Sequence, residues 1–184
     1  QTGFGRTGKM FAVEHTGVRP DILVMAKGIA SGLPLSAIAA PRSLMEKWEP
    51  GSHGGTYGGN AVACAAALAT LRVLREEKLL DNARERGEEL MAGLEELQGR
   101  YDSIGEVRGL GLMVAAEFVG PDRQPHKALA KEVIHQAMDR RMLLLSCGTF
   151  DNVIRLIPPL VVKPEEIERG LTIFEESLAA AMQR

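Results

Sequence analysis

The segment Asp21–Gly28, DILVMAKG, is the stretch that decides the class of fold. Its residues Ile22–Ala26 form a short unbroken apolar run between two charged residues. Such a run predicts a strand buried on both faces, as in a parallel sheet with helices on each side. The run ends at Lys27, and the following Gly28 lets the backbone approach a bound ligand closely. We therefore expect an α/β layer around this segment.

The residues that follow predict a second strand, a loop and a helix. The apolar run Leu35–Ala40 lies between two prolines, and Pro50–Asn60 contains five glycines, which predicts a loop. Asn60 is a good N-cap for the segment Ala61–Arg75. Because that segment is apolar on nearly every side until its last turn, we predict an interior helix.

Beyond Leu80 the pattern changes to short strands that alternate with amphipathic helices. The segment Asp81–Leu97 has one apolar stripe among many charges, which is typical of a surface helix. The predicted strands are Ile104–Val107, Leu112–Phe118, Met142–Leu145 and Val153–Ile157, and the further predicted helices are Lys127–Arg141 and Pro164–Met182. We place a domain boundary near Leu80, with part of an α/β layer before it and a small α+β unit after it.

The composition excludes several classes of protein. The 184 residues are 45% hydrophobic and 25% charged with a net charge of −2, so neither nucleic acid nor an anionic membrane is an expected partner. The longest apolar stretch, Ala61–Leu71, is too short to span a bilayer. Cys64 and Cys147 have no metal-binding or redox spacing, and the four histidines show no ligand spacing. We expect two buried, reduced thiols, a cytoplasmic protein and no metal site.

The opening segment matches a nucleotide-binding pattern without its context. Gly3–Gly8 reads GFGRTG and fits G-x-G-x-x-G, with Asp21 near the distance of a ribose-binding acid. That motif requires a strand before it and a helix after it. Here Asp21 opens a strand instead of closing one. A glycine-rich loop is the better interpretation.

Lys27 has two interpretations. An amine in an apolar pocket at the end of a strand can lose its proton, and a neutral amine is what Schiff-base chemistry requires. A lysine that ends a strand can equally extend its amine into water. The residue spacing alone does not decide between them.

Two further segments suit an anion. His53–Asn60, HGGTYGGN, offers glycine amides, the Thr56 hydroxyl and a helix start, or it is a tight turn capped by Asn60. Arg155 lies within the apolar run Val153–Pro159, where its guanidinium needs a carboxylate or phosphate partner. Alternation places Val153, Arg155 and Ile157 on one face, in an apolar pocket or on the outer side of an edge strand.

These segments together resemble the class III pyridoxal-phosphate aminotransferases. The resemblance rests on five motifs in one order: Gln1–Gly8, Asp21–Lys27, Gly54–Asn60, Val107–Gly111 and Arg155. Within the class, Leu143–Gly148 followed by Asn152–Arg155 is most similar to 4-aminobutyrate aminotransferases. The resemblance implies transfer of an amino group from 4-aminobutyrate or a similar ω-amino acid to 2-oxoglutarate. It leaves open acetylornithine or another diamine as the donor, and an inactive fragment that acts as a folding or dimerisation module.

The resemblance also implies roles for single residues. Lys27 would bind pyridoxal 5'-phosphate covalently and then shuttle a proton between substrate and cofactor. Thr56 would bind the cofactor phosphate from the neighbouring subunit of a homodimer. Gln1 would contact the phenolic oxygen of the cofactor, and Arg155 would bind the α-carboxylate of glutamate or 2-oxoglutarate.

The resemblance finally implies a domain arrangement. Residues 1–80 would be the C-terminal part of the large cofactor-binding domain of fold type I, the aspartate aminotransferase-like fold. Residues 81–184 would be the small α+β C-terminal domain. The family places an aspartate for the pyridinium nitrogen and a phosphate loop upstream of the position of Gln1. The early strands would therefore belong to a larger sheet, and their apolar edges should be exposed or paired with another copy.

Overall fold

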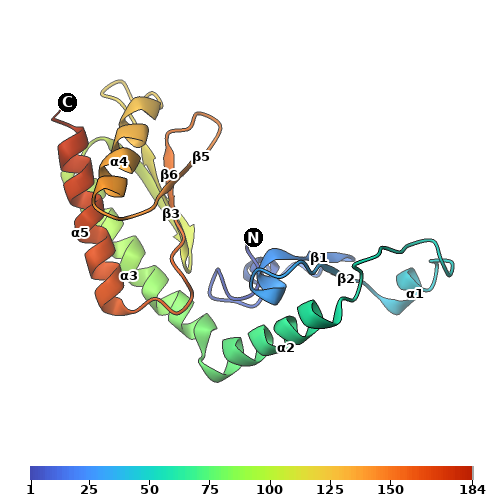
Figure 1. The fold of residues 1–184 in the computed structure, drawn as a ribbon. Helices are drawn as coiled ribbons and strands as arrows, with labels where there is room; N and C mark the ends of the chain where they lie inside the picture. The colour runs from blue at the N-terminus through green and yellow to red at the C-terminus, as the bar shows by residue number, and fades with distance from the viewer. Residues whose placement is uncertain (184) are drawn as a thin grey trace. The chain divides into compact units, whose positions relative to one another are not determined.

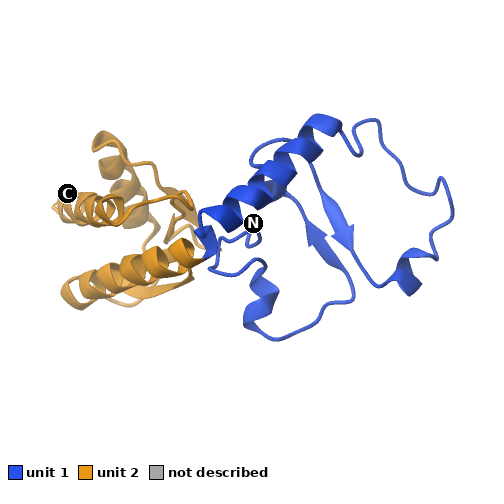
Figure 2. Ribbon diagram, turned by 90° about the horizontal axis from the view of Figure 1, so that it is seen from below, with its two compact units in different colours: residues 1–80 blue, residues 81–184 orange. Residues whose placement is uncertain are grey.

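The computed structural model describes residues 1–183 and divides the chain into two compact units, Gln1–Leu80 and Asp81–Arg184 (Figures 1 and 2). Neither unit contains, in the described part, a helix long and apolar enough to cross a membrane. Cys64 and Cys147 are free and only partly buried, so the expectation of fully buried thiols is wrong.

Unit 1 is built from short elements and one long helix. They are η1 (Ala12–His15), β1 (Leu23–Met25), η2 (Lys27–Ala30), β2 (Ala37–Ala39), α1 (Arg42–Met45) and α2 (Ala61–Glu76). β1 and β2 form an antiparallel pair in which Val24 stands opposite Ile38. The expected parallel, doubly buried strand is therefore wrong for the described residues, and Val24 is 73% exposed. An apolar run signals that burial is favourable but does not identify the partner strand. The sequence also predicts apolar edges here that are exposed or paired with another copy, and the side chains of Val24 and Ile38 are exposed.

Helix α2 begins where the sequence predicts. Asn60 caps it, because its side-chain oxygen accepts the backbone N–H groups of Val62 and Ala63 at 3.0 and 3.1 Å. The expectation of an interior helix is wrong within unit 1. Small residues and Leu74 are buried, whereas Val62 and Leu68 are 68% and 66% exposed. The helix packs against η2.

Unit 2 is an antiparallel sheet with helices on one face (Figure 1). Its elements are α3 (Leu79–Arg100), β3 (Ile104–Leu110), β4 (Met113–Phe118), α4 (Lys127–Asp139), β5 (Leu145–Cys147), β6 (Val153–Leu156) and α5 (Pro164–Ala181). The strand order is β3-β4-β6-β5, and each neighbouring pair is antiparallel. The last strand along the chain thus lies inside the sheet.

One predicted strand in unit 2 is displaced. The sequence predicts Met142–Leu145, whereas β5 begins at Leu145. Arg141 adopts a left-handed φ of 64°, and the N–H of Met142 donates to the carbonyl of Ala137 at 2.8 Å. These residues form the end of α4. Leu144 is buried next, and strand β5 therefore begins only at Leu145.

The two faces of this sheet differ. The covered face contributes Val114, Ala116, Ile154 and Leu156 to a core shared with α3, α4 and α5. Helix α3 approaches the β3–β4 turn closely at Gly87. A Cβ added there would lie 2.3 Å from the carbonyl oxygen of Gly111 in the turn. The opposite face carries mainly charged and half-buried residues, and it positions Arg155.

Candidate functional site

Lys27 lies on a strained turn at the end of β1. It is the first residue of η2 and adopts φ of 56°, a left-handed conformation that is rare for residues with a side chain. Ser31 at the other end of the turn has φ of 46°. Such backbone strain costs about 1–3 kcal/mol per residue and clusters at functional sites. The Lys27 side chain is exposed and forms no hydrogen bond or ion pair with the other described residues.

The loop that contains Gln1 packs against this turn. A Cβ added to Gly28 would lie 3.2 Å from the Cβ of Phe4, so the two segments are in close contact. Phe4 is 7% exposed and packs edge-on against Phe11 at 5.4 Å between ring centroids. The structure thus brings the Gln1 loop to the Lys27 turn, with Gln1 itself exposed.

Thr56 lies in the glycine loop before α2 and is exposed. Backbone hydrogen bonds from Gly58 to Gly55 at 3.1 Å and from Asn60 to Tyr57 at 3.2 Å fold this loop into consecutive turns. The tight turn capped by Asn60 is therefore present. The cap uses the Val62 and Ala63 amides of α2, so an anion here would bind to the Thr56 hydroxyl and the glycine amides. No hydrogen bond joins Thr56 to Lys27 or Gln1 in the described residues.

Arg155 lies in unit 2 on the open face of the sheet. It stands between Ala115 of β4 and Leu145 of β5. Its Nε is fully covered and has no hydrogen-bond partner among the described residues. A covered guanidinium nitrogen without a partner is costly, and a bidentate carboxylate would satisfy it. Because β6 has a strand on each side, the alternative of an edge strand is wrong.

A second arginine on this face, Arg108, was not predicted from the sequence as a candidate site residue. Arg108 lies on β3, opposite Ala115 of β4. Its Nη1 donates at 2.7 Å to Glu106 and at 2.7 Å to Glu117. The hydrogen bond to Glu117 raises the pKa of Arg108 above its usual value, against a partial desolvation that lowers it. The signal was the alternation of charged residues in β3, but only the strand register pairs them.

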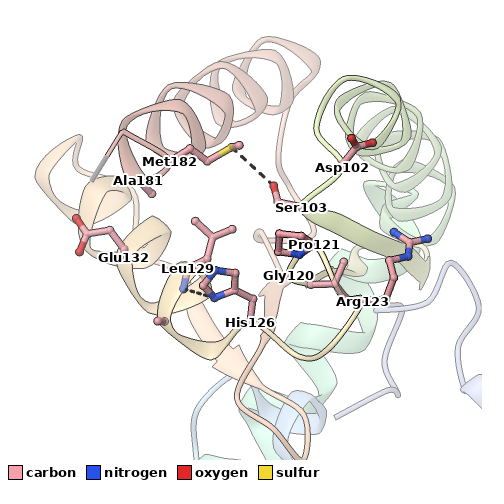
Figure 3. A pocket seen from close by; sticks show the side chains of 12 residues that line it. Asp102, Ser103, Gly120, Pro121, Arg123, His126, Leu129, Glu132, Ala181 and Met182 are labelled. Carbon is pink, nitrogen blue, oxygen red and sulfur yellow. Dashed lines mark hydrogen bonds between the residues drawn. The ribbon is translucent and has the colours of Figure 1, made fainter.

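A cavity of about 990 Å³ lies elsewhere in unit 2 (Figure 3). It is bordered by the end of α5, the start of α4 and the loop after β4. His126 Nδ1 accepts the N–H of Leu129 at 3.2 Å, and the Ser103 hydroxyl donates to Met182 Sδ at 3.7 Å. None of the predicted site residues lines this cavity. Within residues 1–183, no three His, Cys, Asp or Glu side chains are placed to hold a metal ion.

The family model of the class III aminotransferases matches residues 1–178. The chain belongs to the class III aminotransferases. The resemblance drawn from the five motifs is therefore confirmed. Members of this class depend on pyridoxal phosphate.

Curated relatives of this class III aminotransferase chain carry three different names. It is 47% identical over 180 residues to 5-aminovalerate aminotransferase from Pseudomonas putida. It is 41% identical over 185 residues to 4-aminobutyrate aminotransferase from Escherichia coli, and 43% identical over 176 residues to acetylornithine aminotransferase from Gloeobacter violaceus. These alignments cover 97%, 100% and 95% of the chain. They cover 42%, 43% and 42% of the relatives, so the chain spans less than half their length.

Solved structures of the class confirm the fold. A transaminase from a marine Virgibacillus matches 99% of the chain with a TM-score of 0.92 and 32% identity, over 44% of its own length. The ornithine aminotransferase from Toxoplasma gondii, described with partial occupancy of pyridoxal phosphate at its active site, matches 100% of the chain and 42% of its own. Its TM-score is 0.88 and its identity 37%. The expected α/β fold of a class III aminotransferase is thus correct.

Proposed function

We propose that this chain is the portion of a class III aminotransferase that carries the cofactor lysine, Lys27, and the substrate-carboxylate arginine, Arg155. The whole protein would transfer an amino group from 4-aminobutyrate or a similar ω-amino acid to 2-oxoglutarate, giving a semialdehyde and glutamate. Residues 1–80 would be part of the large cofactor-binding domain and residues 81–184 the small C-terminal domain. The observation that carries the proposal is the covered Nε of Arg155, which has no hydrogen-bond partner among residues 1–183.

The residues around Lys27 fit pyridoxal phosphate. The amine is exposed and free of bonds to the described residues, and Gly28 leaves no side chain where the Gln1 loop packs. Lys27 would hold the cofactor covalently, and Gln1 would contact its phenolic oxygen. Thr56 and the glycine amides around it would bind the phosphate, which suits their exposure.

The reaction divides between the cofactor and this chain. Bound pyridoxal phosphate supplies an electron sink for the electron pair left when the substrate carbon loses its proton. The freed Lys27 amine would take that proton and return it at the acceptor carbon, as a general base and then a general acid. Arg155 would hold the substrate carboxylate by a bidentate pair.

The assembly and location follow from the same assignment. We propose a homodimer in which each Thr56 serves the site of the neighbouring subunit, because its loop is exposed in the chain. Exposed apolar residues of β1 and α2, such as Val24 and Leu68, provide surface for further packing. Two free cysteines suit the cytoplasm.

A different amino donor is the second candidate. The relatives named for acetylornithine and 4-aminobutyrate are 43% and 41% identical to the chain, so identity does not favour either donor. A substrate panel with the complete protein separates them. Faster turnover of 4-aminobutyrate than of acetylornithine supports the first proposal, and indifference to 4-aminobutyrate contradicts it.

Covalent labelling tests the role of Lys27. The 184-residue chain is incubated with pyridoxal phosphate, reduced with borohydride and analysed by mass spectrometry. We expect a pyridoxyl group on Lys27 and its loss in Lys27→Arg. The chain carries exposed control lysines such as Lys163. Equal labelling of Lys27 and Lys163 would contradict the cofactor role and favour a fragment that acts only in folding or dimerisation.

A further inference from the structure

Glu117 lies between two arginines on the open face of the unit 2 sheet. It stands opposite Glu106 on β3 and opposite Val153 on β6. Arg108 lies two residues after Glu106 on β3, and Arg155 lies two residues after Val153 on β6. Both arginines are therefore diagonal neighbours of Glu117 on one face of the sheet. Diagonal neighbours are within reach of long side chains. One carboxylate is therefore placed where either arginine could bind it.

The hydrogen bonds show which arginine Glu117 binds. Glu117 Oε2 and Glu106 Oε2 both accept from Arg108 Nη1, each at 2.7 Å. The other oxygen of Glu117 accepts from Asn152 Nδ2 at 3.4 Å, and the Asn152 side chain is 2% exposed and fixed by a second bond. Arg155 Nε has no partner in the described part of the chain. Two acids thus bind Arg108, and within the described part of the chain neither of them binds Arg155 Nε.

We propose that Arg108 is a positioning residue that keeps Glu117 away from Arg155 and so reserves the Arg155 guanidinium for a substrate carboxylate. This inference rests on the proposed function, in which Arg155 binds 2-oxoglutarate. Arg108 itself does not touch the substrate. It acts by binding the Glu117 carboxylate, which would otherwise compete with substrate for the Arg155 guanidinium.

Electrostatics explains why Arg108 is needed. Glu106 and Glu117 stand directly opposite each other on neighbouring strands, and like charges in that position repel. Arg108 lies between them in the ion-pair network and removes this repulsion. Without Arg108, the Glu117 carboxylate would lose its cation while Arg155 remained within diagonal reach. A bidentate pair between Glu117 and Arg155 would then form, and a substrate carboxylate would have to displace it.

Nuclear magnetic resonance of the 184-residue chain tests the pairing without any ligand. The side-chain Nε–Hε signal of Arg155 is assigned by its loss in Arg155→Lys. In Arg108→Leu we expect this signal to move downfield, because Hε would bind a carboxylate. The double variant Arg108→Leu/Glu117→Gln should return it to the original position. Arg108→Lys keeps a cation beside Glu117 and should leave the signal in place.

Arg84→Leu is the matched control. It removes an arginine that pairs with Asp81 at 2.9 Å and is exposed on α3. We expect no change in the Arg155 signal. Circular dichroism identifies any variant that has lost its fold. If folded Arg108→Leu leaves the Arg155 signal unmoved, or if the added Glu117→Gln does not reverse the movement, the inference is wrong.

Substrate kinetics in the complete protein provides the second readout. A competing, half-exposed ion pair should raise the KM for 2-oxoglutarate by about two- to fivefold in Arg108→Leu. The KM should recover in the double variant, and the KM for the amino donor should change less. If the Arg155 signal moves as expected but Arg155→Ala leaves the KM for 2-oxoglutarate unchanged, the proposed function fails while the pairing stands. Unchanged KM in Arg108→Leu, with Arg155 shown to bind substrate, overturns the reserving role.

Discussion

The backbone at Gly28 and the side chain of Phe4 are in direct contact: a Cβ at position 28 would lie 3.2 Å from the Phe4 Cβ. This contact joins the Gln1 loop to the turn that presents Lys27. The absence of a side chain at Gly28 therefore allows the Gln1 loop to pack closely against the Lys27 turn. Because Phe4 is buried, it cannot move away without loss of packing.

Replacing Gly28 should reduce the labelling of Lys27 while the chain remains folded. Gly28→Val should move the Phe4 loop and destabilise the chain by about 1–3 kcal/mol. It should also reduce pyridoxyl labelling of Lys27 in the borohydride experiment. Gly99→Ala, where no atom lies within 4 Å of the new Cβ, is the control. Labelling of Gly28→Val at the level of the control would show that this spacing does not matter for Lys27.

Two glycines of α3 should respond in opposite ways to alanine. At Gly87 the new Cβ would lie 2.3 Å from the backbone oxygen of Gly111, which cannot rotate away. We expect Gly87→Ala to lower the free energy of unfolding by about 2–3 kcal/mol. At Gly99 the Cβ meets no atom, and alanine should be neutral or stabilise by up to about 1 kcal/mol. Urea unfolding measures both, and equal effects would contradict the close crossing of α3 over the β3–β4 turn.

Tyr101 should titrate above an ordinary tyrosine. Desolvation is the main cause of the raised pKa of Tyr101, followed by its hydrogen bond to Glu175, at 3.2 Å. The folded state therefore favours the neutral phenol. Stability from this group is complete below about pH 10, the ordinary tyrosine pKa, and is lost as the pH rises through the folded value.

Phenolate absorbance in the Tyr57→Phe variant isolates Tyr101, because the chain has two tyrosines. The midpoint should lie above that of a model tyrosine and fall when Glu175→Gln is added. A midpoint that is unchanged by Glu175→Gln would exclude the negative charge of Glu175 as a cause.

Arg155→Ala should separate the two half-reactions of the complete protein. A charge-assisted pair contributes about 1.5–3 kcal/mol, so kcat/KM for 2-oxoglutarate should fall by about ten- to a hundredfold. The amino donor should be affected less. Arg155→Lys should recover little, because an ammonium lacks the planar fork. Equal losses for donor and acceptor would argue against the carboxylate role.

The sequence predicts most elements of unit 2 closely, and β5 is the main exception. The bounds of α4 and α5 differ from the predicted ones by at most two residues at either end, since their apolar stripes and the proline at the start of α5 are local signals. β5 is displaced because the hydrogen bonds that end α4 extend to Met142. No local pattern reports such a bond.

The candidate site shows the same division. Lys27 and the glycine loop before α2 stand out in the sequence because glycine and lysine mark special backbone and chemistry. The choice between alternatives for Arg155 needed the strand order, which places β6 inside the sheet. The pairing of Arg108 with Glu117 depends on register between strands distant along the chain, and a single sequence does not contain it.

The strand order β3-β4-β6-β5 has a consequence for synthesis. β5 leaves the ribosome before β6, yet its only neighbour in the sheet is β6. It therefore stays unpaired until Val153–Leu156 follows and inserts between β4 and β5. Arg155 is carried by that same inserting strand. A chain interrupted before this point would lack the arginine and would leave β5 and one edge of β4 unpaired, and such open edges promote aggregation. The proposed carboxylate site and the complete four-stranded sheet thus both form when β6 inserts.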